Sequence, residues 1–336
     1  MTEQNELTAE MPWIDRADAN VDAFIFNYSK PVSFDLSEKL RFWSKNGYVV
    51  FRNVVPLDLI DQFIAEVDHL RENFHDYAIP IEVRGKQTWS KAVSREVIEG
   101  IGVKFNHLHT YSLHAAHLSL TREVTEFLQA VFGSPAAPMQ SLTFWMGSQQ
   151  STHIDYPFVN MQRRLAYMAA SWIPLEDVHA DAGPLAYYPG AHRPEVTGFF
   201  DWGGGDIISR EKTRLRNGRE FAAYLDDRLL QAHVEREIFL PKKGDVLIWH
   251  CNMPHTGTTV RDDRRTRKSY VTHFTGLDDY PARWIPQDGK GSTGVIRRHS
   301  GVIMDFPWNK AEGKLPSWRD HFARKTEGGG DSGSAS

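Results

Sequence analysis

A His-x-Asp pair and one distant histidine are the residues whose types and spacing could do chemistry. His153 and Asp155 are two positions apart, and side chains at i and i+2 of a strand point to the same face. Both could therefore reach one ion. A third ligand must come from another strand, and His255 follows the run 244–249, which predicts a turn and a buried strand. Two histidines and one carboxylate are the donor set typical of non-haem Fe(II) sites.

The composition indicates a globular protein and excludes several classes of function. Hydrophobic residues make up 41% of the 336 residues, as is typical of a globular chain. The net charge of −4 means that the protein as a whole does not attract nucleic acid or an anionic membrane electrostatically. No apolar run reaches the roughly 20 residues of a membrane span. The residues after Met1 have neither the basic region nor the apolar core that is typical of a signal peptide. The single cysteine, Cys251, allows no internal disulfide and predicts a small buried side chain. We expect a cytoplasmic protein with a small-molecule substrate; the oligomeric state stays open.

The first part of the chain is predicted to be mainly helical. Helices are expected at 37–45, where Ser37 would be the N-cap, at 56–70 and at 121–132, with a short strand at 48–51. Residues 1–33 carry little pattern and are expected to wrap the surface, whereas residues 78–104 are expected to be irregular.

After Pro135 and Pro138 the pattern changes to short strands with glycine and proline between them. Strands are expected at 140–146, 165–173, 185–188, 246–249 and 269–275. This pattern predicts a mainly β fold with flanking helices, either a barrel or a double-sheet jelly roll. We expect one domain over 1–326, with a helical part at 34–133, a core at 139–280 and a disordered Gly/Ser tail at 327–336.

One long insert, at about 195–237, interrupts the strand series. It contains a predicted helix at 219–230. Phe199, Phe200 and Trp202 would offer an apolar cover, and the glycines 203–205 a hinge, so the insert could be a lid. The alternative is a surface insertion without a function.

The chain resembles the phytanoyl-CoA dioxygenase family of Fe(II)/2-oxoglutarate oxygenases. The segments that carry this resemblance lie in family order and are 46–50, His153 with Asp155, 172–177, 183–192, 244–246 and His255 with 267–268. The resemblance implies a double-stranded β-helix (jelly-roll, cupin-like) core with Fe(II), 2-oxoglutarate and O2. It also implies hydroxylation with release of succinate and CO2, since halogenases of this kind lack the carboxylate that Asp155 supplies. Lipids, amino-acid derivatives and natural products all remain possible substrates.

The resemblance also implies roles for residues around the metal. Arg267 would bind the far carboxylate of 2-oxoglutarate, while Arg261, Arg264 and Arg265 would lie on the surface, and Trp172 would form a wall near the cosubstrate. Two departures from the family pattern are visible. Arg267 follows His255 by twelve residues, where eleven is common, and Gly257 replaces a hydroxyl residue. Thr256 and Thr258 are the candidates to supply the missing hydroxyl group.

Two other functions compete with this interpretation. A catalytically silent binding module would have a broken triad or no arginine, whereas this sequence has an intact triad and the arginine. A zinc-dependent hydrolase could use the same ligands but would leave Arg267 unexplained. A second histidine cluster, His107, His109, His114 and His117, has no acidic neighbour in sequence, so we expect ordinary packing or cavity lining there.

Overall fold

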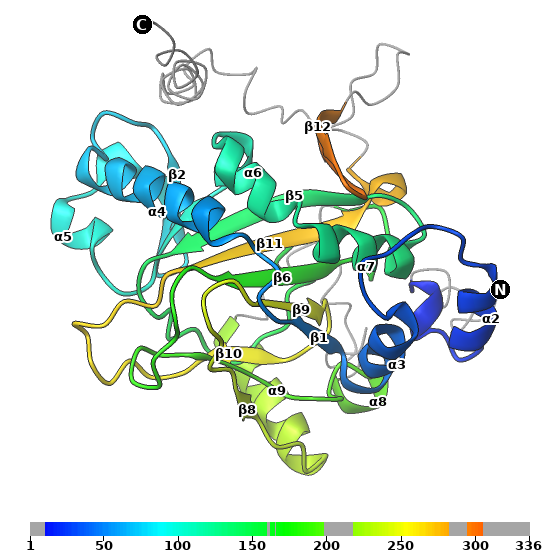
Figure 1. Ribbon diagram of the computed structural model, residues 1–336. Helices are drawn as coiled ribbons and strands as arrows, with labels where there is room; N and C mark the ends of the chain where they lie inside the picture. Colours follow the sequence, from blue (N-terminus) through cyan, green and yellow to red (C-terminus); the bar gives the residue numbers. More distant parts are fainter. Residues whose placement is uncertain (1–10, 160–161, 165, 198–217, 282–293, 305–336) are drawn as a thin grey trace, which may run out of the picture.

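The computed structural model describes residues 11–159, 162–164, 166–197, 218–281 and 294–304. The proposed cover residues Phe199, Phe200 and Trp202, the glycines 203–205 and the tail 327–336 lie outside these ranges. Figure 1 shows the described chain as two facing groups of strands with helices around them.

The helices lie mostly in the first part of the described chain. They are η1 (Trp13–Asp15), α2 (Val21–Asn27), α3 (Leu36–Asn46), α4 (Leu57–Glu72), η2 (Ser90–Ala92), α5 (Arg95–Ile98), η3 (Leu108–Thr110), α6 (Leu113–Ser119), α7 (Arg122–Phe132), α8 (Pro194–Thr197), α9 (Gly218–Gln231) and η4 (Leu277–Asp279). The predicted helices at 37–45, 56–70, 121–132 and 219–230 are therefore confirmed. The predicted cap Ser37 is wrong, because the side chain of Asp35 accepts the hydrogen bond from Glu38 N. Among the described residues, no helix has the length and apolar character needed to cross a membrane.

The strands form two sheets. They are β1 (Tyr48–Phe51), β2 (Pro80–Val83), β3 (Lys86–Trp89), β4 (Val103–Asn106), β5 (Ala136–Phe144), β6 (Ala169–Pro174), β7 (Leu185–Tyr187), β8 (Glu237–Ile238), β9 (Val246–His250), β10 (His255–Gly257), β11 (Ser269–Gly276), β12 (Gly294–Arg298) and β13 (Gly301–Met304). The larger sheet has the order β1-β9-β6-β11-β5-β4-β2-β3, with β13 also on β5, and the smaller has the order β10-β7-β8. Along both orders the neighbouring strands are antiparallel, which confirms the predicted fold class.

The central strands β9, β6 and β11 of the larger sheet are buried along their whole length. On β11, Tyr270 and Phe274 pack into the core that the sheet forms with α3, α4, α6 and α7, the helices drawn along this side in Figure 1. Val271, between them, faces the smaller sheet and packs with Leu185 and Phe239. This explains why β6 is almost continuously apolar in sequence, as expected for a strand covered on both sides.

The strand register collects the inward-facing side chains into rows. One row contains Gln140, His273, Ala170 and Trp249, and the next contains Leu142, Val271, Trp172 and Leu247. Neighbouring residues in such a row lie about 5 Å apart, close enough for their side chains to contact. The first row therefore places polar groups from three separate strands around one point inside the barrel.

The prediction that 78–104 is irregular is wrong. This range contains β2, β3 and α5, and β4 begins at its end, so the larger sheet continues beyond β5. The hairpin β2–β3 turns at Arg84 and Gly85, both with positive φ (49° and 83°). A two-residue turn of this kind normally carries Asn or Gly at its first position. Because arginine stands there instead, the sequence did not indicate a β-hairpin.

The expected break at Pro135 and Pro138 is also wrong. Strand β5 starts at Ala136 and runs through Pro138. The register shifts at this point, because Pro138 pairs with Phe274 while Gln140 pairs with His273. A proline is tolerated at such a bulge, where the ladder does not need its missing N–H group.

A comparison of Gly47 with Gly133 tests how much the close packing around Gly47, next to β1, contributes to stability. Both end an 11-residue helix with φ of 75°, but an added Cβ at Gly47 would collide with His192 and Met253, whereas Gly133 has nothing within 4 Å. We expect Gly133→Ala to reduce the free energy of unfolding by about 1–2 kcal/mol, through backbone strain alone. Gly47→Ala should cost about 1–3 kcal/mol more, through overpacking. Urea unfolding of the two variants measures the difference, and equal losses would contradict the packing at Gly47.

Candidate metal centre

The two histidine ligands are joined through their backbones. His153 N donates to His255 O, and His255 N donates to His153 O, each at 3.0 Å. This isolated antiparallel bridge connects the segment after β5 to β10. Asp155 N donates to Cys251 O at 3.1 Å, which fixes the carboxylate ligand against the segment before β10. The expectation of a regular strand at His153 is wrong, since only this bridge is formed, but the side chains of His153 and Asp155 still converge.

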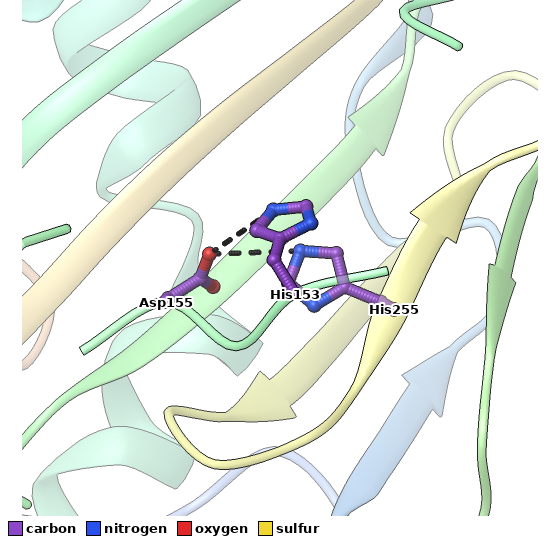
Figure 2. Close-up of side chains that lie close together, drawn as sticks. All are labelled: His153, Asp155 and His255. Atoms are coloured by element: carbon purple, nitrogen blue, oxygen red, sulfur yellow. Dashed lines mark ion pairs between the residues drawn. The ribbon is translucent and has the colours of Figure 1, made fainter. Parts of the chain in front are cut away.

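The three side chains lie around one point (Figure 2). Asp155 Oδ1 is 3.5 Å from His255 Nε2 and 3.8 Å from His153 Nε2. One ligand atom from each residue lies within 4.8 Å of the others. Among the described residues this is the group of three or more His, Cys, Asp or Glu side chains that could hold a metal ion. The predicted triad is therefore assembled.

Both imidazoles present the nitrogen that a metal needs. His153 Nδ1 lies 2.9 Å from Ser151 O, and His255 Nδ1 lies 3.0 Å from Met253 O. A carbonyl oxygen only accepts, so each Nδ1 carries the proton and each Nε2 carries a lone pair. Burial, followed by the neighbouring His255, lowers the pKa of His153 to about 3, so His153 is neutral at neutral pH. Such backbone partners are the usual means of orienting a histidine ligand.

The second carboxylate oxygen of Asp155 is held by groups from two strands. Trp249 Nε1 donates to Asp155 Oδ2 at 2.7 Å, and His273 Nε2 lies 3.6 Å from the same oxygen. Burial by itself raises the pKa of Asp155, but the imidazoles of His255, His273 and His153 outweigh it and lower the pKa below its usual range. Oδ2 is thus occupied and Oδ1 faces the histidines, which favours a carboxylate that binds through one oxygen.

A cavity of about 470 Å³ opens at the triad. Its lining includes the three ligands and, from the rest of the barrel, Glu82, Gln87, Lys104, Gln140, Leu142, Phe144, Ser148, Gln150, Phe158, Trp172, Leu185, Trp249, Gly257, Arg267 and His273. The predicted wall residue Trp172 is therefore in the cavity. Lys104 and Glu82 form an ion pair of 2.8 Å in this lining. Sequence reasoning missed this pair, because its two strands were expected to be irregular.

Arg267 is a buried cation that faces this cavity. Its Nε has no hydrogen-bond partner among the described residues, and its guanidinium lies 5.3 Å from the ring of Phe144 and 5.7 Å from that of Trp172. The nearby carboxylate of Glu176 already accepts from Thr266 Oγ1 and Lys268 N. Burial lowers the pKa of Arg267 to about 10, with Glu176 opposing, so it stays charged at neutral pH. A buried charge without a partner is costly, which makes an anionic ligand favourable here.

The other three arginines of the segment 261–267 lie on the surface, as predicted. Arg264 and Arg265 pair with Asp262, and Arg261 lies 3.8 Å from Asp181. The side chain of Arg264 is 86% exposed.

The hydroxyl groups of Thr256 and Thr258 do not face the cavity. Thr256 Oγ1 donates to Gln150 O and Thr258 Oγ1 donates to Pro184 O, each at 2.8 Å. The geometry therefore corrects the suggestion that either one replaces the hydroxyl residue absent at Gly257. The hydroxyl group of Ser148 lies where a side chain at Gly257 would begin, and Ser148 lines the cavity. No pattern in the sequence joins these two distant positions.

The second histidine cluster has structural partners. His109 Nδ1 lies 2.8 Å from Ser141 Oγ, and His114 Nδ1 lies 2.5 Å from Glu66 Oε1. Burial lowers the pKa of His109 well below its usual value. These histidines do not appear among the metal-capable groups of the described residues, so the expectation of ordinary packing agrees with the structure.

The Trp249 bond to Asp155 gives a direct test of this geometry. We expect Trp249→Phe to weaken binding of a divalent metal roughly 10- to 100-fold, the usual cost of losing a group that orients a ligand. Trp172→Phe is the matched control, because Trp172 lines the same cavity without a hydrogen bond to a ligand side chain among the described residues. Titration with Co(II), followed by its visible absorption, measures both. Equal affinities in the two variants would exclude this role of Trp249.

The fold matches that of known protein structures. One similar structure is the non-haem α-ketoglutarate-dependent carbocyclase SnoK from nogalamycin biosynthesis, with a TM-score of 0.53, 20% sequence identity, and a match that covers 79% of this chain and 90% of SnoK. Another is EctD from S. alaskensis with 2-oxoglutarate and 5-hydroxyectoine, with a TM-score of 0.53, 12% identity, and a match that covers 82% of this chain and 90% of EctD. The epimerase SnoN, in complex with Fe3+, α-ketoglutarate and nogalamycin RO, has a TM-score of 0.52 and 16% identity, and the match covers 81% of this chain and 97% of SnoN.

At these identities the three structures share with this chain the fold, a jelly-roll core. No curated protein sequence matches the chain. The model of the phytanoyl-CoA dioxygenase family matches residues 43–269, which is more than half of the chain and contains all three members of the triad as well as Arg267. The predicted family is therefore confirmed, and this chain belongs to the phytanoyl-CoA dioxygenase family.

Proposed function

We propose that this protein is an Fe(II)/2-oxoglutarate-dependent dioxygenase that hydroxylates a small organic molecule. The observation that carries the proposal is a single cavity containing both a His-Asp-His triad and a buried arginine whose Nε has no hydrogen-bond partner among the described residues. The triad accounts for a metal, and the arginine accounts for an organic anion bound beside it. A zinc-dependent hydrolase would need only the first of these features, and a silent binding module would need neither.

The donor set fits ferrous iron. Two neutral imidazoles and one carboxylate oxygen occupy one side of an ion and leave the other side open. His153 and His255 are held as Nε2 ligands by Ser151 and Met253, and Asp155 is held by Trp249. Bound iron would supply the activation of O2, coupled to conversion of 2-oxoglutarate to succinate and CO2. The protein then has to keep the ligands oriented and water excluded.

Arg267 is the proposed site for the C5 carboxylate of 2-oxoglutarate. Its planar guanidinium can donate two parallel hydrogen bonds to a carboxylate. Phe144 and Trp172 flank the guanidinium, so a carboxylate bound there would be shielded from water and attracted more strongly. Ser148 is the proposed second donor, because its hydroxyl group lines this cavity beside Gly257.

Hydroxylation of a small molecule is the finer part of the proposal. Asp155 retains the carboxylate ligand, which leaves no ligand position for a halide in its place. EctD is solved with 5-hydroxyectoine, a hydroxylated small molecule, whereas SnoK and SnoN carry out cyclisation and epimerisation. Because proteins of the same fold differ in this way, hydroxylation is the outcome that product analysis must test.

An anaerobic titration tests the cofactors without knowledge of the substrate. Adding Fe(II) and then 2-oxoglutarate to the protein should produce a weak visible charge-transfer band. Asp155→Ala should lose the band, because the ion loses its anionic ligand. Candidate substrates can then be compared by stimulated succinate release, and products formed under ¹⁸O₂ examined by mass spectrometry. A product without ¹⁸O would argue against hydroxylation, and absence of the band in the unmodified protein would reject the cofactor assignment.

Arg267→Ala tests the cosubstrate site separately. Two hydrogen bonds to a charged group contribute about 1.5–3 kcal/mol each, so the apparent KM for 2-oxoglutarate should rise roughly a hundredfold or more. Arg264→Ala removes the same side chain from an exposed position on the same segment and should change this KM little. The measurement is 2-oxoglutarate-dependent succinate release. A large effect of Arg264→Ala together with a small effect of Arg267→Ala would contradict the assignment.

A further inference from the structure

The segment 148–150 lies directly on β10 at Gly257. Gln150 O accepts hydrogen bonds from Gly257 N at 3.0 Å and from Thr256 Oγ1 at 2.8 Å. A Cβ at Gly257 would lie 2.9 Å from Gln149 N and 3.0 Å from Gln150 N, and it would also collide with Ser148 Oγ. These distances are too short for a side chain, so the missing side chain at 257 is what allows the segment to lie there.

This placement brings the side-chain amide of Gln150 within hydrogen-bond distance of the candidate ligand His153. Gln150 Nε2 lies 3.0 Å from His153 Nε2. The Nδ1–H group of His153 is directed at Ser151 O, so His153 Nε2 can only accept. The carboxamide N–H group of Gln150 therefore donates to the lone pair that a metal ion would bind.

We propose that Gln150 is a displaceable positioning residue of the metal centre. Without metal, its carboxamide holds His153 Nε2 and competes with the ion for the lone pair. On metal entry the side chain gives up this bond, while the two hydrogen bonds to Gln150 O keep its backbone in place. The carboxamide then stays beside the metal, where it can donate to a ligand on the open side. The proposal rests on the triad being a metal site, as the proposed function requires.

If Gln150 competes with the metal for His153, removing Gln150 should change the metal affinity in the opposite direction from removing a residue that supports the bound metal. A group that stabilises the bound metal weakens binding when it is removed, as expected for Trp249. Gln150 stabilises the metal-free form through a bond that metal binding breaks, so its removal should strengthen binding. One such hydrogen bond corresponds to roughly a three- to tenfold change in the dissociation constant.

The test is Co(II) titration of the full-length protein and of Gln150→Leu, which keeps the bulk of the side chain and removes the donor. We expect the Co(II) dissociation constant of Gln150→Leu to fall roughly three- to tenfold. Gln87→Ala, which removes an exposed carboxamide from the same cavity at β3, should leave the constant unchanged.

Thermal melting with and without Co(II) shows whether each variant is folded and gives a second reading. A tighter metal complex should increase the metal-induced rise in Tm. Unchanged or weaker Co(II) binding by folded Gln150→Leu would overturn the proposal, and Gln150→Ala serves in its place if the leucine variant does not fold. If the unmodified protein binds no Co(II), or binds it as tightly after Asp155→Ala, the metal centre and the proposed function fail instead.

Discussion

The backbone bridge between His153 and His255 is the contact on which the site depends. These residues are about 100 positions apart, and two hydrogen bonds of 3.0 Å hold them opposite each other. Every other feature of the centre is placed relative to this bridge. Asp155 reaches the same point from one side of it, and Gly257 supports the segment 148–150 on the other side. A small shift in this pairing would separate the ligand nitrogens while leaving the two sheets intact.

Burial has opposite consequences for the two principal charges of the cavity. The carboxylate of Asp155 is buried but has Trp249 and three histidines around it, so it remains ionised without a metal. The guanidinium of Arg267 is equally buried and has aromatic rings around it, with no partner for its Nε among the described residues. Burial of an unpaired charge costs free energy that a bound anion recovers. The same desolvation is therefore outweighed by neighbouring groups at Asp155, whereas at Arg267 it favours the binding of an anion.

Helix α9 of the insert is not free of the core. Phe221 and Leu225 are buried with Ile154 and Tyr156, which stand on either side of Asp155. Phe158, at the cavity, contacts both the His153 ring and the Phe221 ring, at centroid distances of 6.1 and 6.2 Å. Helix α9 is thus packed against the segment that carries His153 and Asp155, so substitutions on α9 can reach the candidate metal centre through this apolar contact.

The sequence by itself predicted which residues could hold a metal, because His153, Asp155 and His255 are a donor set whose chemistry follows from residue type. It also determined the main helices and the strands of the barrel, since hydrophobic periodicity records which face is buried. Only the tertiary structure decided the strands between 80 and 106, whose turn at Arg84 lacks the usual residues. The same holds for the groups that surround the ligands. Trp249, Ser148 and Gln150 act through contacts with residues far away in the chain, and strand register, which sets such contacts, leaves no local pattern in sequence.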